Sequence, residues 1–173
     1  MSTAVSSDRR AKRALERQLA HQEAKARALP KDLGAIEADL TRYAFAVKAS
    51  IEEYRPFSSK TRVLEVGSGA HGVVFFLGMN AAIGVDPLAE EYARLFPKWQ
   101  SRVRTVAAAG EALPFPDASF DVVISDNVVD HARDPAKIVS ELARVLAPSG
   151  VLYFTVNVHH RLYGIASRLH GAL

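Results

Sequence analysis

The sequence predicts an α/β domain with a doubly wound, mostly parallel sheet of about five strands. From residue 61 onward, apolar runs of five or six residues alternate with segments that have helical spacing. Within these runs apolar and polar residues do not alternate, which is typical of parallel strands that helices cover on both faces. At 173 residues, the chain is long enough for one domain with a sizeable core.

Two helices are expected before the first strand. Residues 7–29 contain good helix formers and no Gly or Pro, and Pro30 ends the run. In this segment Leu15 begins an apolar stripe of heptad-like spacing, but polar residues interrupt the stripe. Residues 34–54 place apolar side chains three and four positions apart, so the second helix has one apolar face.

The later elements follow from the alternation. Strands are expected at residues 62–66, 81–85, 103–107, 120–125 and 151–156. Helices are expected at residues 72–79, 88–96 and 135–146. Pro135 fits the first turn of its helix. Residues 148–150, Pro-Ser-Gly, turn the chain into the last of these strands.

The composition excludes several classes of protein. The chain has no Cys, which excludes a disulfide framework and a thiolate zinc site. It has no run of about 18 apolar residues, so a membrane-spanning helix is not expected. The N-terminal segment lacks the apolar core of a secretory signal peptide, and a cytoplasmic protein is therefore expected.

The basic charge is concentrated at the N-terminus. Residues 1–31 contain eight Lys or Arg and three acids, a net charge of +5. The whole chain has a net charge of +3, so residues 32–173 carry a net charge of −2. We expect residues 1–31 to form a basic, helical N-terminal arm and residues 32–173 the folded domain. Such an arm is either a solvated tail or a contact for an anionic surface. Nucleic acid is not the expected partner, since the domain shows no basic surface interleaved with aromatic residues.

A glycine-rich loop follows the first strand. Its sequence from residue 67 is Gly-Ser-Gly-Ala-His-Gly, and glycine permits the close approach of a ligand to the main chain. The spacing Gly67-x-Gly69-x-x-Gly72 also fits a dinucleotide fingerprint, so the glycines alone do not select a cofactor. A tight strand–helix turn without a ligand is the remaining alternative.

Two acidic residues narrow the possibilities. Asp86 follows the second strand, where an ionised carboxylate accepts hydrogen bonds from both hydroxyls of a ribose. Glu65 lies near the end of a buried strand, where an unpaired charge is costly. A ligand ammonium, reached directly or through water, would give Glu65 a partner.

Two longer stretches are more specific than the glycines. Residues 110–123 read GEALPFPDASFDVV, and residues 144–150 read RVLAPSG. With the loop and the two acids, they make residues 60–158 resemble the small-molecule branch of Rossmann-like, class I S-adenosylmethionine-dependent methyltransferases. The chain departs from that family at His71, where members usually have a glycine.

The resemblance implies S-adenosylmethionine as the cofactor and a small molecule as the methyl acceptor. It also implies cofactor contacts from four segments: Glu65, Gly67, Ser68 and Gly69 around the methionine part and the ribose edge; Asp86 on the ribose hydroxyls, with Pro87 and Leu88 beside the adenine; Glu111, Ala112 and Leu113 on the other side of the adenine; and Asp126 and Asn127 near the methionine end.

The residues for chemistry are less defined than those for binding. His131 and Asp130 follow the fourth strand, at the sheet edge where ligands bind in open α/β sheets, and they are candidate bases. A structural histidine is the alternative for His131. The adjacent pair His159 and His160 would point to opposite faces of an extended segment, so no metal site is expected.

The sequence contains too few residues after the fifth strand for the last two strands of that fold. The fifth strand is therefore expected to be an open edge that invites pairing with a missing C-terminal segment or with another subunit. This leaves a non-catalytic or partner-dependent binding module as the alternative to a methyltransferase. A nicotinamide-dependent oxidoreductase fits the glycine spacing and Asp86 but not Glu65 or residues 111–123.

Overall fold

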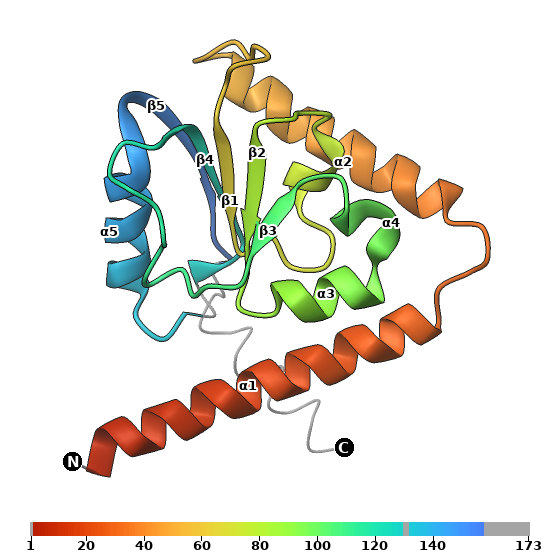
Figure 1. Ribbon diagram of the computed structural model, residues 1–173, viewed down its shortest axis with the longest axis vertical. Helices are drawn as coiled ribbons and strands as arrows, with labels where there is room; N and C mark the ends of the chain where they lie inside the picture. The colour runs from red at the N-terminus through yellow and green to blue at the C-terminus, as the bar shows by residue number, and fades with distance from the viewer. Residues whose placement is uncertain (1, 130–131, 158–173) are drawn as a thin grey trace.

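The computed structural model describes residues 2–129 and 132–157. Their five strands form one parallel sheet in the order β3-β2-β1-β4-β5, with helices on both faces (Figure 1). The strands are β1 (Val63–Val66), β2 (Ala82–Val85), β3 (Arg104–Val106), β4 (Phe120–Asp126) and β5 (Leu146–Thr155). The predicted fold class is confirmed.

The two faces of the sheet bury two separate apolar clusters. Helix α2 (Gly34–Glu52) packs on one face, and α5 (Pro135–Val145) packs on the other. Strand β1 contributes to both clusters, since Val63 lies in the α2 cluster and Leu64 in the α5 cluster. Burial on both faces explains why the central strands β1, β2 and β4 are mostly apolar along their length.

Helix α1 (Ser2–Arg27) lies across the edge at which the parallel strands end (Figure 1). Leu15 and Leu19 on this helix pack against the α2-side cluster, as do Ala26 and the following Leu29. Within the described residues, no helix combines the length and apolar character needed to cross a membrane.

The helix expected at residues 72–79 is reduced to a single 3₁₀ turn, η1 (Val73–Phe76). Its residues are β-branched or aromatic and lose side-chain freedom in a helix. Gly78, with φ of +68°, then turns the chain out of helical geometry. The helix expected at residues 88–96 is α3 (Ala89–Leu95), and a short helix α4 (Pro97–Gln100), which was not expected, follows it.

Strand β5 begins five residues earlier than expected, directly after α5. Leu146 pairs with Phe120, and the register then shifts so that Val151 pairs with Val122. The Pro-Ser-Gly segment therefore lies in an irregular part of the strand instead of preceding it. In the described residues β5 is an edge of the sheet, as expected, and Leu152 and Phe154 on this strand and Val156 directly after it are exposed.

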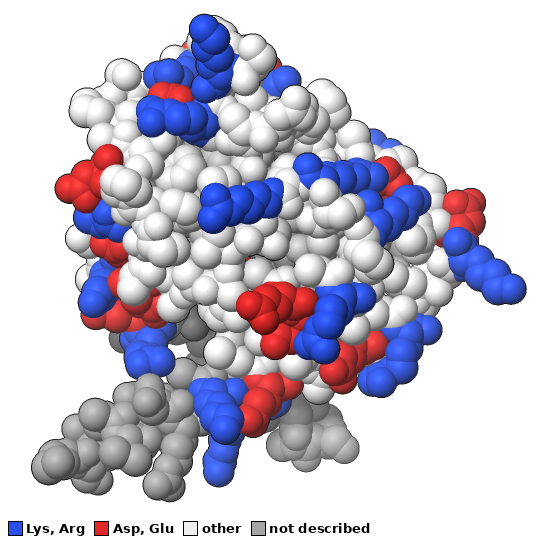
Figure 2. Space-filling model, viewed as in Figure 1, with Lys and Arg blue, Asp and Glu red and all other residues white. Residues whose placement is uncertain are grey.

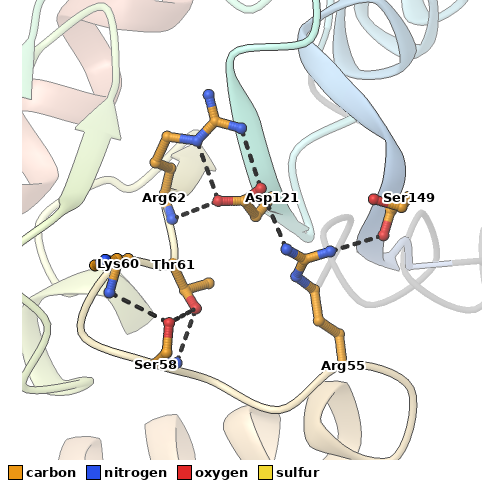
Figure 3. Close-up of polar contacts among 7 residues, drawn as sticks. All are labelled: Arg55, Ser58, Lys60, Thr61, Arg62, Asp121 and Ser149. Atoms are coloured by element: carbon orange, nitrogen blue, oxygen red, sulfur yellow. Dashed lines mark hydrogen bonds and ion pairs between the residues drawn. The ribbon is translucent and has the colours of Figure 1, made fainter.

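A polar cluster lies at the end of the sheet where the strands begin, opposite the carboxyl ends (Figure 3). The Arg62 guanidinium donates to both oxygens of Asp121, with Nε···Oδ2 3.1 Å and Nη2···Oδ1 3.0 Å. Arg55 reaches the same carboxylate at 3.3 Å and donates to the Ser149 carbonyl oxygen. Hydrogen bonding to Arg62 lowers the pKa of Asp121 to about 2. The cluster joins the segment after α2 to β1, β4 and β5 at the amino-terminal ends of the strands.

Candidate functional site

A cavity of about 510 Å³ lies at the carboxyl ends of the strands, in the range of small-molecule sites. Open α/β sheets bind ligands at this edge. The lining combines the glycine loop and the loops after β2, β3 and β4 with one side of α1. The lining residues are Ala14, Leu15, Arg17, Gln18, Val66, Gly67, Gly69, Asp86, Pro87, Ala108, Ala109, Gly110, Glu111, Asn127, Val128, Ala132, Arg133 and Ile138.

The glycine loop adopts a backbone conformation that requires glycine at two positions. Gly67 has φ of +75° and Gly69 has φ of +54°. A Cβ on Gly67 would lie 2.3 Å from a methyl group of Val128, so side-chain packing also excludes a larger residue. The amide of Gly67 donates to the Val85 carbonyl oxygen at 2.7 Å, which joins the start of the loop to the end of β2.

Asp86 directly follows β2 and connects the glycine loop to the loop after β2, both of which line the cavity. Its Oδ2 accepts from the Gly69 amide at 3.0 Å, and its Oδ1 accepts from the Leu88 amide at 2.9 Å. The residue is 6% exposed, and burial raises its pKa. Each carboxylate oxygen has more than one lone pair, so both oxygens keep acceptor capacity toward the cavity.

Glu65 finds its partners within the chain. Its two oxygens accept from the amides of Val73, at 3.1 Å, and Val74, at 2.8 Å, so the carboxylate binds the start of η1. The side chain is buried, and burial raises its pKa to about 7. The partner that the sequence suggested, a ligand ammonium, is therefore not needed to explain the buried acid, and Glu65 does not line the cavity.

The loop after β3 is held against α5 by two charged residues. Glu141 Oε2 accepts from the Leu113 amide at 2.8 Å, and Arg144 donates to the carbonyl oxygens of Leu113 and Phe115. The Arg144 guanidinium lowers the pKa of Glu141 to about 2. These contacts give the GEALPFPDASFDVV and RVLAPSG stretches a shared structural role. Glu111 faces the cavity and accepts from the Arg133 amide at 3.0 Å.

A polar cluster surrounds Asp126 at the end of β4. Its carboxylate accepts from Tyr43 Oη at 2.7 Å, from Asn127 Nδ2 at 3.3 Å and from Thr155 Oγ1. Burial and the neighbouring Asp126 raise the pKa of Tyr43. Asn127 has φ of +54° and lines the cavity. No pattern in the sequence indicated that Tyr43, on α2, would contact Asp126.

The structure brings half of the predicted cofactor residues to the cavity wall. Those that line it are Gly67, Gly69, Asp86, Pro87, Glu111 and Asn127. Those that do not line it are Glu65, Ser68, Leu88, Ala112, Leu113 and Asp126. The candidate bases Asp130 and His131, and the pair His159 and His160, lie outside the described residues. Within residues 2–129 and 132–157, no three acidic or His side chains are grouped as metal ligands.

Helix α1 is a wall of the cavity that the sequence interpretation missed. Four of its residues, from Ala14 to Gln18, face the cavity. Gln18 Nε2 donates to Tyr92 Oη at 3.0 Å, which ties α1 to the helix that follows Asp86. The apolar stripe that begins at Leu15 was the sequence signal for this contact. Its side chains pack on the core of the domain and not on a second copy of the helix, as they would in a coiled coil.

The charges on the surface are mixed. On the face shown in Figure 2, Lys and Arg side chains are interspersed with Asp and Glu side chains among uncharged residues. The cavity lining likewise contains both acids, Asp86 and Glu111, and bases, Arg17 and Arg133. A site of this composition suits a small ligand that carries both apolar and polar groups.

Comparisons with known proteins identify relatives of the chain. The model of the methyltransferase domain family matches residues 64–154. An uncharacterized methyltransferase of Mycobacterium sp. (strain JLS) is 40% identical over 101 residues, which are 54% of this chain and 38% of that protein. The uncharacterized methyltransferase YcgJ of Bacillus subtilis is 39% identical over 95 residues, 51% of this chain and 38% of that protein.

Solved structures share the fold. The YcgJ crystal structure aligns with a TM-score of 0.52 at 30% identity, covering 62% of this chain and 48% of that chain. Phosphoethanolamine N-methyltransferase 2 of Haemonchus contortus, solved in complex with S-adenosyl-L-methionine, aligns with a TM-score of 0.56 at 22% identity, covering 75% of this chain and 32% of that chain.

The match extends over the sheet and the loops that line the cavity. The chain spans 30–48% of the length of the curated relatives it matches. The family model covers more than half of the 173 residues, from β1 to β5. The chain belongs to the methyltransferase domain family.

Proposed function

We propose that the cavity binds S-adenosylmethionine and that the protein transfers its methyl group to a small-molecule acceptor. The observation that carries the proposal is the position of Asp86, which is buried, faces the cavity and is hydrogen-bonded to Gly69 in the glycine loop. A carboxylate in this position is suited to the two hydroxyls of a ribose.

The rest of the lining fits the other parts of the cofactor. Val66, Ala108 and Ile138 offer an apolar surface on which an adenine ring would pack, with Pro87 close to Asp86. The glycine loop lets a ligand approach the backbone closely. Asn127, at the end of β4, supplies a side-chain amide for the polar methionine end.

The demands on the protein for methyl transfer are modest. The bound cofactor supplies a methyl group already activated on a sulfonium, so the residues of the site mainly exclude water and align the acceptor. A general base is needed only where the acceptor atom carries a proton at neutral pH. We retain His131 and Asp130 as candidates for that role, because they lie in the segment that follows β4 in the sequence.

Two alternatives make different predictions. A nicotinamide-dependent oxidoreductase would bind NADH in the same cavity, and membership in the methyltransferase domain family counts against it. A non-catalytic module would bind a partner through the open edge of β5, where Phe154 and its apolar neighbours are exposed, and would show no methyl transfer.

Calorimetric titration of the purified chain with S-adenosylmethionine, S-adenosylhomocysteine and NADH separates these functions. We expect both S-adenosyl ligands to bind and NADH not to bind. Asp86→Ala should weaken binding by at least about tenfold, or about 1.4 kcal/mol. Glu90→Ala is the matched control, because it removes an exposed acid on α3 that does not line the cavity. Equal affinity of a folded Asp86→Ala variant and the wild type would refute the proposal.

A further inference from the structure

Two side chains from α4 donate hydrogen bonds to carbonyl oxygens of the glycine loop, whereas Asp86 accepts from an amide of the same loop. Trp99 Nε1 donates to the Ala70 carbonyl oxygen at 2.8 Å. Gln100 Nε2 donates to the carbonyl oxygens of Gly69, at 2.9 Å, and Ala70, at 3.1 Å. Gly69 is thus held at its amide by Asp86 and at its carbonyl oxygen by Gln100.

Both donors are buried in a rigid setting. Trp99 is 0% exposed and Gln100 is 3% exposed. The Trp99 ring stacks on Phe96, with centroids 5.7 Å apart and planes 17° apart. His71, the residue that departs from the family pattern, packs against both rings, with its centroid 4.8 Å from Phe96 and 5.3 Å from Trp99. The aromatic cluster therefore leaves Trp99 little freedom to move away from the loop.

Gln100 is an unfavourable residue for stability alone. Its Oε1 atom is buried and has no hydrogen-bond partner among the described residues. An unsatisfied buried acceptor costs free energy, and an apolar side chain of similar size would avoid that cost. The gain that offsets it is the pair of hydrogen bonds from Nε2 to the loop.

The direction of these bonds sets the orientation of the loop backbone. In a planar trans peptide the carbonyl and the following amide point in opposite directions. Because the Gly69 and Ala70 carbonyls point toward α4, the amides of Ala70 and His71 point away from it. The α4 side chains thus determine the face of the loop toward which the amides of Ala70 and His71 point.

We propose that Gln100 and Trp99 are positioning residues of the cofactor site, which act by holding Gly69 and Ala70 in the binding conformation. This inference rests on the proposed function, since it assigns the loop to cofactor binding. It separates two properties that a purely structural role would join: Gln100 serves cofactor affinity, whereas buried core residues that do not contact the loop serve stability alone.

Gln100→Met tests this separation. Methionine has a similar size and packs adaptably but lacks the amide donors. We expect affinity for S-adenosylmethionine to fall at least about fivefold, the equivalent of one hydrogen bond. The unfolding temperature should change little, because the variant removes the unpaired Oε1 but leaves the Gly69 carbonyl oxygen without its donor. Val47→Ala is the matched control, since it removes packing from the same α2-side core but lies on α2, none of whose residues line the cavity. It should lower the unfolding temperature and leave the affinity of the folded protein within twofold, on the order of measurement error.

Trp99 supplies a second readout, because it is the only tryptophan of the chain. Saturating S-adenosylmethionine should change the fluorescence of Trp99 in the wild type, and a smaller change is expected in Gln100→Met. A Gln100→Met variant that binds as tightly as the wild type overturns the inference and leaves the proposed function intact. A folded wild-type chain that binds no S-adenosylmethionine overturns both.

Discussion

Replacing Glu65 by glutamine tests whether the buried carboxyl group of Glu65 makes the stability of the protein depend on pH. Glu65 is 3% exposed, and both of its oxygens accept amide hydrogen bonds from η1. Burial is the dominant influence on its pKa and raises it to about 7, from an ordinary value of 4.5. The nearby acids Asp126 and Asp86 act in the same direction, and the two amides oppose them.

The raised pKa makes stability depend on pH. Below pH 4.5 the carboxyl is protonated in both the folded and the unfolded chain, so titration of Glu65 costs nothing. Between pH 4.5 and about 7 the unfolded chain releases the proton while the folded chain retains it, and stability falls as pH rises. The interval between the two pKa values corresponds to about 3 kcal/mol at about 1.4 kcal/mol per pH unit.

The assay is urea unfolding of the wild type and Glu65→Gln at several pH values from 4.5 to 8, followed by Trp99 fluorescence. Glutamine does not titrate, so the wild type should lose about 3 kcal/mol relative to the variant across this range. Burial lowers the pKa of His71, which raises stability over part of the same range, but His71 is present in both proteins and cancels in the difference. Parallel stability curves for the two proteins would refute the reasoning.

Three further predictions concern other parts of the structure. Asp121→Asn should lower the free energy of unfolding by about 2 kcal/mol at pH 7, because it weakens charged hydrogen bonds to two arginines, and the loss should shrink below pH 4 in urea melts. Gly67→Ala should abolish cofactor binding measured by calorimetry, because φ at this position is +75° and the new Cβ would lie 2.3 Å from a methyl group of Val128. Tight binding by this variant would contradict the packing of the loop. Gln18→Ala removes the hydrogen bond to Tyr92 and should speed S-adenosylmethionine dissociation about fivefold in stopped flow, whereas an unchanged rate would show that α1 does not close the cavity.

The predictable parts of the fold are those that depend on local patterns. The short apolar runs located the five described strands, and they were clearest for β1, β2 and β4, which are buried along most of their length. Residues 72–79 were wrongly expected to be one helix, since apolar spacing cannot distinguish a helix from a compact 3₁₀ turn of bulky residues. The early start of β5 was missed for a related reason: proline and glycine in residues 148–150 indicate a turn, and the structure accommodates them as a register shift in an edge strand.

The candidate site shows the same division. Gly67, Gly69 and Asp86 were found from the sequence because their positions at strand ends follow from the topology. The partners of Glu65 were not, because the backbone amides of η1 meet its carboxylate only in three dimensions. Contacts between distant segments, such as Gln18 with Tyr92, leave no local pattern in a single sequence.

The most direct test of the central claim is to locate the bound cofactor on the chain. Addition of S-adenosylmethionine to ¹⁵N-labelled protein should shift the amide signals of Gly67, Gly69 and Gly110, together with those of Asn127 and residues 14–18 of α1. Signals from the Arg62–Asp121 cluster at the opposite edge of the sheet should remain unchanged. Absence of shifts in the cavity lining, or shifts confined to another surface of the folded chain, would contradict the account.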